Sequence, residues 1–205
     1  MLSIDEAFAH IDGVATPLTP VSLPLPNALG RVLATAARSL VNLPPFTQSA
    51  MDGYAVRAAE VADAAQQPVM LQVVGTSAAG GPATGPVGAA QAVRIYTGGA
   101  LPEGLDAVVR QEDGVVSTGS HGPMLQVSQP VAVGTHVRTL GEELAAGAVV
   151  IEAGRRLTPG RIGALAMAGV ATVEVAPAPR VVVVVTGDEL QLPGTPLAPG
   201  QVYDA

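Results

Sequence analysis

Residues 45–55 read Pro45-Phe46-Thr47-Gln48-Ser49-Ala50-Met51-Asp52-Gly53-Tyr54-Ala55. This stretch places a carboxylate, a glycine and a hydroxyl-bearing aromatic side by side in a chain otherwise dominated by Ala, Val, Gly and Pro. The whole chain has three Tyr, two Phe and no Trp, and Phe46 and Tyr54 are among them. A stretch that gathers scarce residue types is a candidate functional site. A structural role is also open, because Asp-Gly favours tight turns and Ser49 or Asp52 could cap a helix.

The composition indicates a globular chain rich in turns. Its 205 residues suffice for one large or two small domains, and 48% hydrophobic residues allow a substantial core. The apolar residues are mostly Ala and Val, which suit β-rich layers, and 24 Gly and 18 Pro predict many short elements. No apolar run approaches the roughly 20 residues that cross a bilayer, and the N-terminus does not resemble a signal peptide. With no cysteine, disulfides are excluded and structural zinc is disfavoured, so we expect a cytoplasmic protein with no membrane partner.

The charge pattern narrows the classes of partner. The formal net charge is −7, and all ten basic residues are Arg. The absence of Lys excludes a Schiff-base or P-loop lysine within this chain. Because the arginines are scattered along the sequence, we expect no nucleic-acid partner. An anionic ligand would need local Arg groups or backbone N–H donors.

Apolar periodicity predicts a helix followed by short strands. Ser3 to Ile11 reads as a helix with capping-box spacing between Ser3 and Glu6, and a second short helix is expected around residues 27–33. From residue 69 to 137, strand-like runs alternate with Gly- and Pro-rich turns, which indicates a compact β-barrel or sandwich. The expected strands are 69–74, 92–96, 107–110 and 124–127, with turns at 78–82 and 117–123.

The last part of the chain predicts a change of structural class. Thr158 is placed to cap a helix with Pro159 at its first position and Gly169 at its end, and a strand is expected at 171–175. After a linker, the five valines at 181–185 read as a strand buried on both faces of an α/β sheet. The chain ends too soon after this strand to complete a parallel sheet. We therefore expect it to be a fragment of a larger protein.

Two further segments carry polar residues on tight turns. In the first, a predicted strand leads to Thr97 and a glycine turn. The Thr97 hydroxyl and the exposed N–H groups of the turn could hold an oxyanion. A plain hairpin turn is the alternative. In the second, Arg138 precedes Glu142 and Glu143. Adjacent carboxylates point in different directions on a regular element, so at most one is expected to enter a site. A solvated charged turn is the alternative there.

A last polar segment, Thr186-Gly187-Asp188-Glu189, follows the predicted valine strand. In α/β sheets, ligands bind at the carboxyl ends of strands. Asp188 could bind Mg²⁺ there through a hard carboxylate oxygen, with waters completing the shell.

In their order along the chain, these motifs resemble those of the MoeA/gephyrin family of molybdopterin molybdenumtransferases. The family has Pro-x-Phe-Asp-x-Ser-Ala-Met-Asp-Gly-Tyr-Ala, Thr-Gly-Ala-x-Leu-Pro-x-Gly-Ala-Asp-Ala-Val-Val-x-x-Glu, Arg-x-x-Gly-Glu-Asp, Ser-Thr-Gly-Asp-Glu-Leu and Gly-Gln-x-Tyr-Asp-x-Asn. The corresponding segments here are 45–55, 97–112, 138–143, 185–190 and 200–204. Thr47, Gly99 and Glu143 depart from the pattern by replacing an Asp, an Ala and an Asp. Thr47 puts in doubt any role of that first carboxylate.

The resemblance implies a mixed α and β fold in several domains. An elongated, discontinuous first domain would comprise residues 1–45 and 138–176. A β-rich, barrel-like second domain would be inserted at 46–137. Residues 177–205 would begin a third, α/β molybdopterin-binding domain that is truncated here.

The resemblance also implies an activity and its participants. Family members are homodimers that insert molybdate into adenylylated molybdopterin and release AMP, with Mg²⁺ required, after handover of the pterin from a molybdopterin adenylyltransferase. By motif match, Asp52 and Glu142 would be catalytic, Ser49, Thr97 and Asp188 would bind substrate, and Asp188 would also serve the metal. The fragment alone is expected to be inactive. Two alternatives stay open: a non-catalytic dimerisation or scaffold module of the gephyrin type, and a paralogue that serves tungsten or another molybdopterin step.

Overall fold

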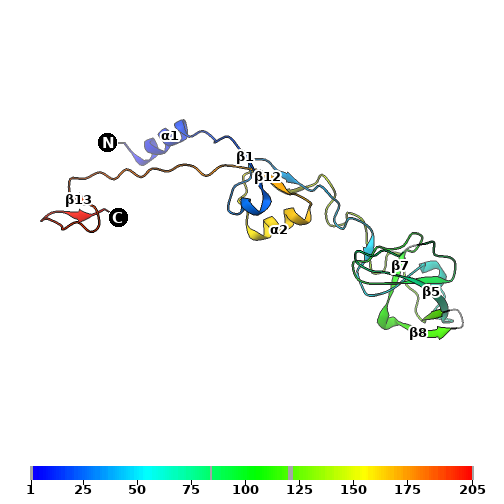
Figure 1. The fold of residues 1–205 in the computed structure, drawn as a ribbon. Coiled ribbons are helices and arrows are strands. Elements are labelled where there is room, and N and C mark those ends of the chain that lie inside the picture. Colours follow the sequence, from blue (N-terminus) through cyan, green and yellow to red (C-terminus); the bar gives the residue numbers. More distant parts are fainter. Residues whose placement is uncertain (1, 84, 120–121, 205) are drawn as a thin grey trace. The chain divides into compact units, whose positions relative to one another are not determined.

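The computed structural model describes residues 2–83, 85–119 and 122–204 (Figure 1). Two α-helices and three 3-10 turns accompany many short strands within these ranges. The helical elements are α1 (Ile4–Val14), η1 (Leu25–Ala28), η2 (Ala58–Val61), η3 (Gln111–Asp113) and α2 (Pro159–Met167). The strands are β1 (Val21–Pro24), β2 (Ala37–Arg38), β3 (Gln48–Ser49), β4 (Gly53–Val56), β5 (Val69–Ser77), β6 (Gln91–Ile95), β7 (Ala107–Arg110), β8 (Gly114–Gly119), β9 (Gly122–Val127), β10 (Val137–Arg138), β11 (Val149–Ile151), β12 (Thr172–Val175), β13 (Leu190–Gln191) and β14 (Val202–Tyr203). The structure is therefore mixed α and β, with most of its elements strands.

The contacts divide the chain into two compact units, residues 22–175 and the combination of 1–21 with 176–205. The second of these contains α1, whose start follows the sequence prediction. The Ser3 hydroxyl accepts from the Glu6 N–H at 3.2 Å, and the Glu6 carboxylate accepts from the Ser3 N–H at 2.7 Å, which completes the predicted capping box. The same unit holds β13 and β14, which pair in parallel.

A six-stranded sheet dominates the unit of residues 22–175, in the order β7-β4-β6-β5-β9-β8. Adjacent residues of a strand face opposite sides of a sheet, so Ala55 and Val56 enter two different apolar clusters. The strands expected at 69–74, 92–96, 107–110 and 124–127 are confirmed as β5, β6, β7 and β9. β7 and β8 each pair with one neighbour among the described strands, so the sheet is open and a closed barrel is not confirmed.

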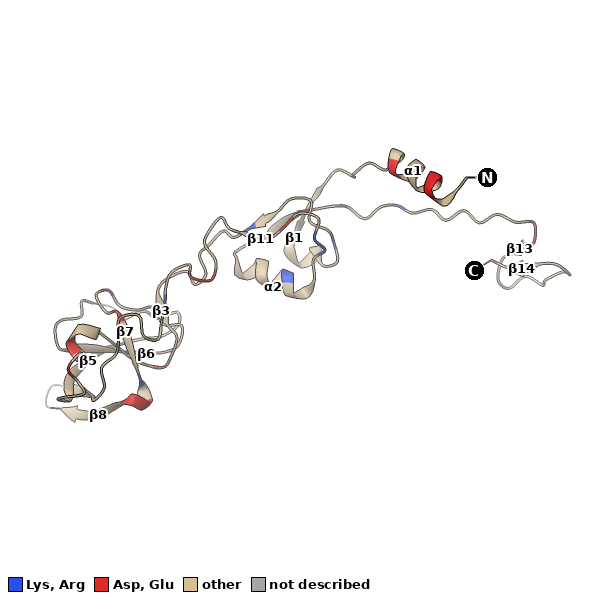
Figure 2. Ribbon diagram, turned by 180° about the vertical axis from the view of Figure 1, so that it is seen from behind, with Lys and Arg blue, Asp and Glu red and all other residues tan. Residues whose placement is uncertain are grey.

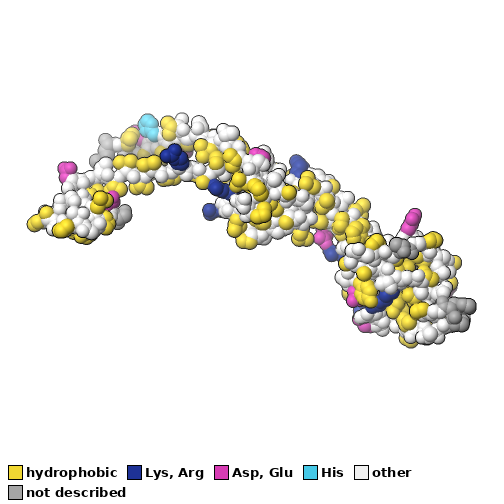
Figure 3. All heavy atoms as spheres, viewed as in Figure 1, with side chains coloured by type: hydrophobic (Ala, Val, Ile, Leu, Met, Phe, Trp, Pro, Cys, Tyr) yellow, Lys and Arg dark blue, Asp and Glu magenta, His cyan; other side chains and the backbone are white. Residues whose placement is uncertain are grey.

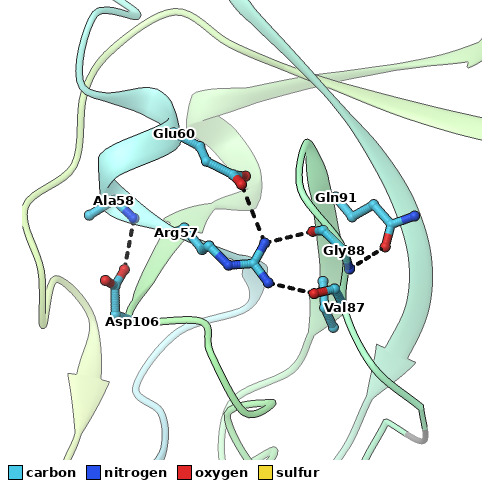
Figure 4. Close-up of polar contacts among 7 residues, drawn as sticks. All are labelled: Arg57, Ala58, Glu60, Val87, Gly88, Gln91 and Asp106. Carbon is cyan, nitrogen blue, oxygen red and sulfur yellow. Dashed lines mark hydrogen bonds and ion pairs between the residues drawn. The ribbon is translucent and has the colours of Figure 1, made fainter.

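Beside this sheet, Arg57 joins separate segments of the chain through its guanidinium (Figure 4). Its guanidinium donates to the carbonyl oxygens of Val87 at 2.5 Å and Gly88 at 2.6 Å, and it pairs with Glu60 at 3.4 Å. Nearby, the Asp106 carboxylate accepts from the Ala58 N–H at 2.7 Å. The bonds to Val87, Gly88 and Asp106 join segments 30 to 48 residues apart, so they stabilise the loops between the strands.

A separate apolar cluster gathers residues from both ends of the unit. Its fully buried members include Leu33, Leu157, Leu165 and Val175, which come from η1, β12, α2 and the segments beside them. α2 begins and ends as the sequence predicts, because the Thr158 hydroxyl accepts from the Arg161 N–H and Gly169 has φ +80°. Within the described residues, no helix is both long and apolar enough to cross a membrane.

The prediction for the five valines is wrong for this structure. Val181 to Val184 are 77–80% exposed and Val185 is 47% exposed, in extended chain without strand pairing to the described residues. Apolar side chains form a row along this segment (Figure 3). The sequence gives the β-branched pattern of a buried strand, but burial also needs neighbouring strands, and none of the described strands takes that place.

Two smaller predictions also need correction. The helix expected at 27–33 is replaced by the single 3-10 turn η1, which begins two residues earlier and ends at Ala28. Pro24 and Pro26 set the backbone for a tight turn there. The stretch 117–123, expected to be a turn, supplies the end of β8 and the start of β9, and residues 120–121 at its centre lie outside the described ranges.

Candidate functional site

The first candidate residue, Asp52, is bound to the second candidate, Thr97. Asp52 is half-buried and precedes β4, and Thr97 lies 45 positions later in the turn after β6. The Thr97 N–H and the Thr97 hydroxyl both donate to Asp52 Oδ1, each at 2.8 Å. These two donors, with the nearby charge of Arg94, hold the pKa of Asp52 below its usual range. The structure thus joins two of the sequence motifs through an ionised carboxylate.

The contact between Asp52 and Thr97 depends on the glycine that follows each of them, Gly53 and Gly98. Gly53 lies in β4 between β6 and β7, where a Cβ atom would clash with the Val109 carbonyl oxygen, so the backbone can approach only without a side chain. Gly98 occupies the third position of the turn that the Gly99 N–H closes onto the Tyr96 carbonyl at 2.8 Å, and its φ is +78°. That conformation favours glycine. The motif therefore forms a tight turn but not the hairpin of the alternative, because β6 and the next strand, β7, are not neighbours in the sheet, and the turn presents Thr97 to Asp52.

Ser49, predicted to bind substrate, is buried, with 1% of its surface exposed. Its hydroxyl donates to the Met51 carbonyl at 2.6 Å and accepts from the Met51 N–H at 3.2 Å. In this conformation the side chain shapes the loop that leads to Asp52.

The third motif lies against the first through a short pair of strands. β10 pairs antiparallel with β3, so that Val137 is opposite Ser49 and Arg138 is opposite Gln48. Ser49 also bonds to the turn of the second motif, because its N–H donates to the Gly99 carbonyl at 3.0 Å and its carbonyl accepts from the Gly98 N–H at 2.9 Å. β3 is thus the element on which all three motifs meet.

Glu142, in the third motif, lies in an exposed turn. It accepts from the Thr139 N–H at 2.8 Å and the Thr139 hydroxyl at 3.2 Å, and these bonds, with Arg138, hold its pKa below the usual range. Glu143 forms an ion pair with the same Arg138. Both carboxylates therefore contact one guanidinium, and the geometry is the charged turn that sequence reasoning left as an alternative.

An open pocket of about 450 Å³ lies at Asp52. It is lined by Met51, Asp52, Thr97, Arg110, Gln111 and Glu112. Arg110 is held by Asp113 through hydrogen bonds of 2.7 and 3.0 Å, and the Gln111 N–H donates to the Asp52 carbonyl at 3.0 Å. The pocket thus offers carboxylates, a hydroxyl, an amide and a guanidinium to a polar ligand. Outside the pocket, the Asp, Glu and Arg residues lie on several different helices, strands and loops (Figure 2).

Asp188 lies in the other compact unit, in an exposed turn that the Leu190 N–H closes onto the Gly187 carbonyl at 3.2 Å. It therefore belongs to a different unit from Asp52, Thr97 and Glu142. In the ranges that the structure describes, no group of three or more His, Cys, Asp or Glu side chains is arranged to hold a metal ion.

Sequence reasoning missed Arg94. Its guanidinium carbon lies 4.9 Å from the ring centre of Tyr54 and 4.8 Å from that of Tyr96, and Nη2 donates to Gln111 Oε1 at 2.7 Å. Tyr54 drew notice as a scarce aromatic, but its pairing with Arg94 depends on the register of β4 against β6. The spacing of Arg94 and Tyr96, which places both on one face of a strand, was the available signal.

Comparison with known proteins extends these observations. The chain is 38% identical over 208 residues to "Molybdopterin molybdenumtransferase 2" of Mycobacterium tuberculosis, covering 100% of this chain and 50% of that protein. It is 38% identical over 205 residues to "Molybdopterin molybdenumtransferase" of Haemophilus influenzae, covering 100% of this chain and 49% of that protein. The chain thus spans about half the length of these curated relatives.

A solved structure, the molybdopterin biosynthesis MoeA protein from Pyrococcus horikoshii, aligns with a TM-score of 0.86 at 31% identity. The alignment covers 100% of this chain and 52% of that protein. Residues 2–169 match the family described as the MoeA N-terminal region, domains I and II. This chain therefore belongs to the MoeA N-terminal family.

Proposed function

We propose that this chain is the N-terminal half of a molybdopterin molybdenumtransferase, an enzyme of molybdenum cofactor biosynthesis that inserts molybdate into adenylylated molybdopterin and releases AMP. The observation that carries the proposal is the Asp52–Thr97 contact, which joins two family motifs at a polar pocket. The names of the relatives that match the whole chain supply the reaction class.

The domain boundaries expected from the sequence form part of this proposal. Residues 1–45 with 138–176 would form the elongated first domain, 46–137 the barrel-like second, and 177–205 the start of the third. The apolar clusters support the first two, because one cluster draws on residues 23–37 and 150–175, whereas the other two draw on residues 54–137. The row of exposed valines supports the third, since it is an apolar strand pattern that pairs with none of the described strands.

The residues of this chain would bind and orient the substrates. A molybdate ion and a phosphoanhydride are both oxyanions, so carboxylates cannot attract them directly. Asp52, ionised and fixed by Thr97, would instead orient a donor or a cation at the pocket, where Arg110 offers positive charge. Glu142 would act from its own turn, and Ser49 would act through the loop it shapes.

Magnesium fits part of this site. Mg²⁺ takes one or two carboxylates together with substrate phosphates, and Asp52 and Glu112 line the same pocket. When bound, the ion would supply charge neutralisation of the oxyanions. Asp188, whose oxygen is of the same kind, would serve the metal and phosphate from the third domain.

The proposed assembly is a homodimer in which the third domain of one subunit closes the site on the first two domains of its partner. A molybdopterin adenylyltransferase would deliver the pterin. The cytoplasmic location expected from the sequence stays a prediction. Because this chain spans half of its relatives, we propose that it is inactive alone.

The experiment is substitution of Asp52 in the longer protein. Asp52→Asn keeps the shape of the side chain and removes its charge, so we expect AMP release to fall about 100-fold, as for a misoriented reacting group. The matched control is Asp63→Asn, an exposed carboxylate that does not line the pocket. Unchanged AMP release in Asp52→Asn would favour a purely structural turn at this motif.

A further inference from the structure

Arg94 contacts two aromatic rings at once. Its guanidinium lies over Tyr54, its cross-strand neighbour in β4, and over Tyr96, two residues later in its own chain. The distances from the guanidinium carbon to the two ring centres are 4.9 and 4.8 Å. Both lie within the range of a cation–π interaction, so the guanidinium stacks on both rings.

The hydrogen bonds of Arg94 converge on the backbone around Asp52. Nη1 donates to the carbonyl of Gly53, the residue after Asp52, at 3.1 Å. Nη2 donates to Gln111 Oε1 at 2.7 Å, and the Gln111 N–H in turn donates to the Asp52 carbonyl at 3.0 Å. Tyr96, under the guanidinium, directly precedes Thr97, whose two donors bind the Asp52 carboxylate.

Arg94 keeps its charge available to this region. Within the described residues, the ion pairs of the unit join Arg57, Arg110 and Arg138 to carboxylates, and none includes Arg94. Its acceptors are neutral oxygens. The charged groups that border Asp52 are then Arg94 itself and, on the pocket wall, Arg110 and Glu112.

We propose that Arg94 is a positioning residue for Asp52: its guanidinium, stacked on Tyr54 and Tyr96, fixes the two peptides that follow that residue. The inference rests on the proposed function for its kinetic consequence, but the positioning itself is a property of this chain. Lys cannot replace Arg in this role, because a compact ammonium lacks the planar fork that donates to Gly53 and Gln111 together while it stacks on aromatic rings.

The first test compares Arg94→Lys with Arg57→Lys in the longer protein. Arg57 also donates to two backbone carbonyls beside the same sheet, but it lies outside the Asp52 pocket, so it is a matched control for lost stability. We expect Arg94→Lys to lower kcat for AMP release at least ten-fold with a smaller change in KM, and Arg57→Lys to retain kcat. Equal kcat in Arg94→Lys and the wild type would overturn the proposal.

A second pair of variants keeps the test valid if Arg94→Lys does not fold. Tyr96 is 42% exposed, so its replacement is tolerated by the core. Tyr96→Phe keeps the ring face and should retain kcat, whereas Tyr96→Leu removes it and should lower kcat several-fold. Equal kcat in these two variants would contradict the role of the Tyr96 ring.

An activity-independent measurement separates this inference from the proposed function. In the 205-residue chain, the Gln111 amide, which donates to the Asp52 carbonyl, should exchange with deuterium faster in Arg94→Gln than in the wild type, and at the wild-type rate in Arg57→Lys. If the longer protein releases no AMP but this faster exchange occurs, the reaction is wrong and the positioning holds. If AMP is released but Arg94→Gln leaves both the exchange rate and kcat unchanged, the positioning is wrong and the reaction holds.

Discussion

At the scale of single residues, the Asp52 carboxylate receives both donors of Thr97 through one oxygen, Oδ1. The described residues place no donor on Oδ2. The carboxylate is half-buried at the wall of an open pocket, so it can meet a ligand without first losing an internal partner. Thr97 therefore acts on Asp52 in this structure, and any contact with a ligand would come second.

Removing the Thr97 hydroxyl should change the titration of Asp52. Thr97→Val keeps the backbone N–H, the larger cause of the low pKa, and removes the side-chain donor, so the pKa of Asp52 should rise part of the way toward its usual value. Thr97→Ser keeps the hydroxyl and should titrate like the wild type. The measurement is NMR titration of the Asp52 carboxyl carbon, and equal values in Thr97→Val and Thr97→Ser would contradict the assigned bond.

The same contact has a consequence for stability. A carboxyl whose pKa is lower in the folded than in the unfolded state stabilises the fold at higher pH, and that stabilisation is lost as the pH falls through the folded value. For Asp52 the loss should therefore occur below about pH 4, the usual Asp range. Urea unfolding at pH 7 and pH 3 should then differ less in Thr97→Val than in the wild type.

At the scale of elements, β4 is the strand on which the site depends. It lies between β6 and β7. Its first residue, Gly53, lies so close to the Val109 carbonyl oxygen that a Cβ atom on Gly53 would clash with that oxygen. Asp52 directly precedes it, so any shift of β4 also moves the carboxylate. The Asp-Gly pair, interpreted from the sequence as a turn signal, owes its glycine to this close approach between strands.

Gly53→Ala should therefore destabilise the sheet. Overpacking typically costs about 1–3 kcal/mol, and here the obstacle is backbone rather than a movable side chain. Gly75→Ala is the control, because Gly75 lies in β5 of the same sheet and a Cβ there meets nothing within 4 Å. Urea unfolding of the two variants measures the difference. Similar free energies of unfolding for both would show that β4 can move at little cost.

α2 offers a test of the apolar cluster that contains Leu33, Leu157 and Val175. Leu165 is 0% exposed and packs in that cluster, whereas Met167 on the same helix is 66% exposed. Leu165→Ala should lower the free energy of unfolding by about 2–5 kcal/mol through the lost contacts and the cavity that remains. Met167→Ala should cost much less. Thermal or urea unfolding checks this, and equal losses would mean that α2 packs differently.

Local signals predicted α1, α2 and most of the strands well, because caps and alternation depend on neighbouring residues alone. Contacts across the sheet were harder. The resemblance supplied Asp52 and Thr97 as site residues, but their direct bond across 45 positions required the fold. Arg94 escaped notice for the same reason, since its stacking on Tyr54 depends on strand register. The valine run shows the converse case, in which a clear strand pattern pairs with no strand in the part of the chain that the structure describes.

At the scale of the whole molecule, the five valines at 181–185 are the segment whose exposure differs most from what its sequence pattern predicts. Val181 to Val184 are 77–80% exposed, although a run of this kind is typical of strands buried on both faces. We expect the amides of residues 181–185 to exchange rapidly with deuterium in this chain and slowly in the longer protein. Comparable exchange in both would mean that the run does not enter the proposed third domain.

We propose that this chain carries half of a molybdenum-inserting site. The most direct measurement is molybdate-dependent AMP release from adenylylated molybdopterin, by the longer protein and by the 205-residue chain at equal concentration. We predict release by the longer protein and none by the chain alone. Release by the chain alone would contradict the division of the site, and no release by the longer protein would contradict the proposed reaction.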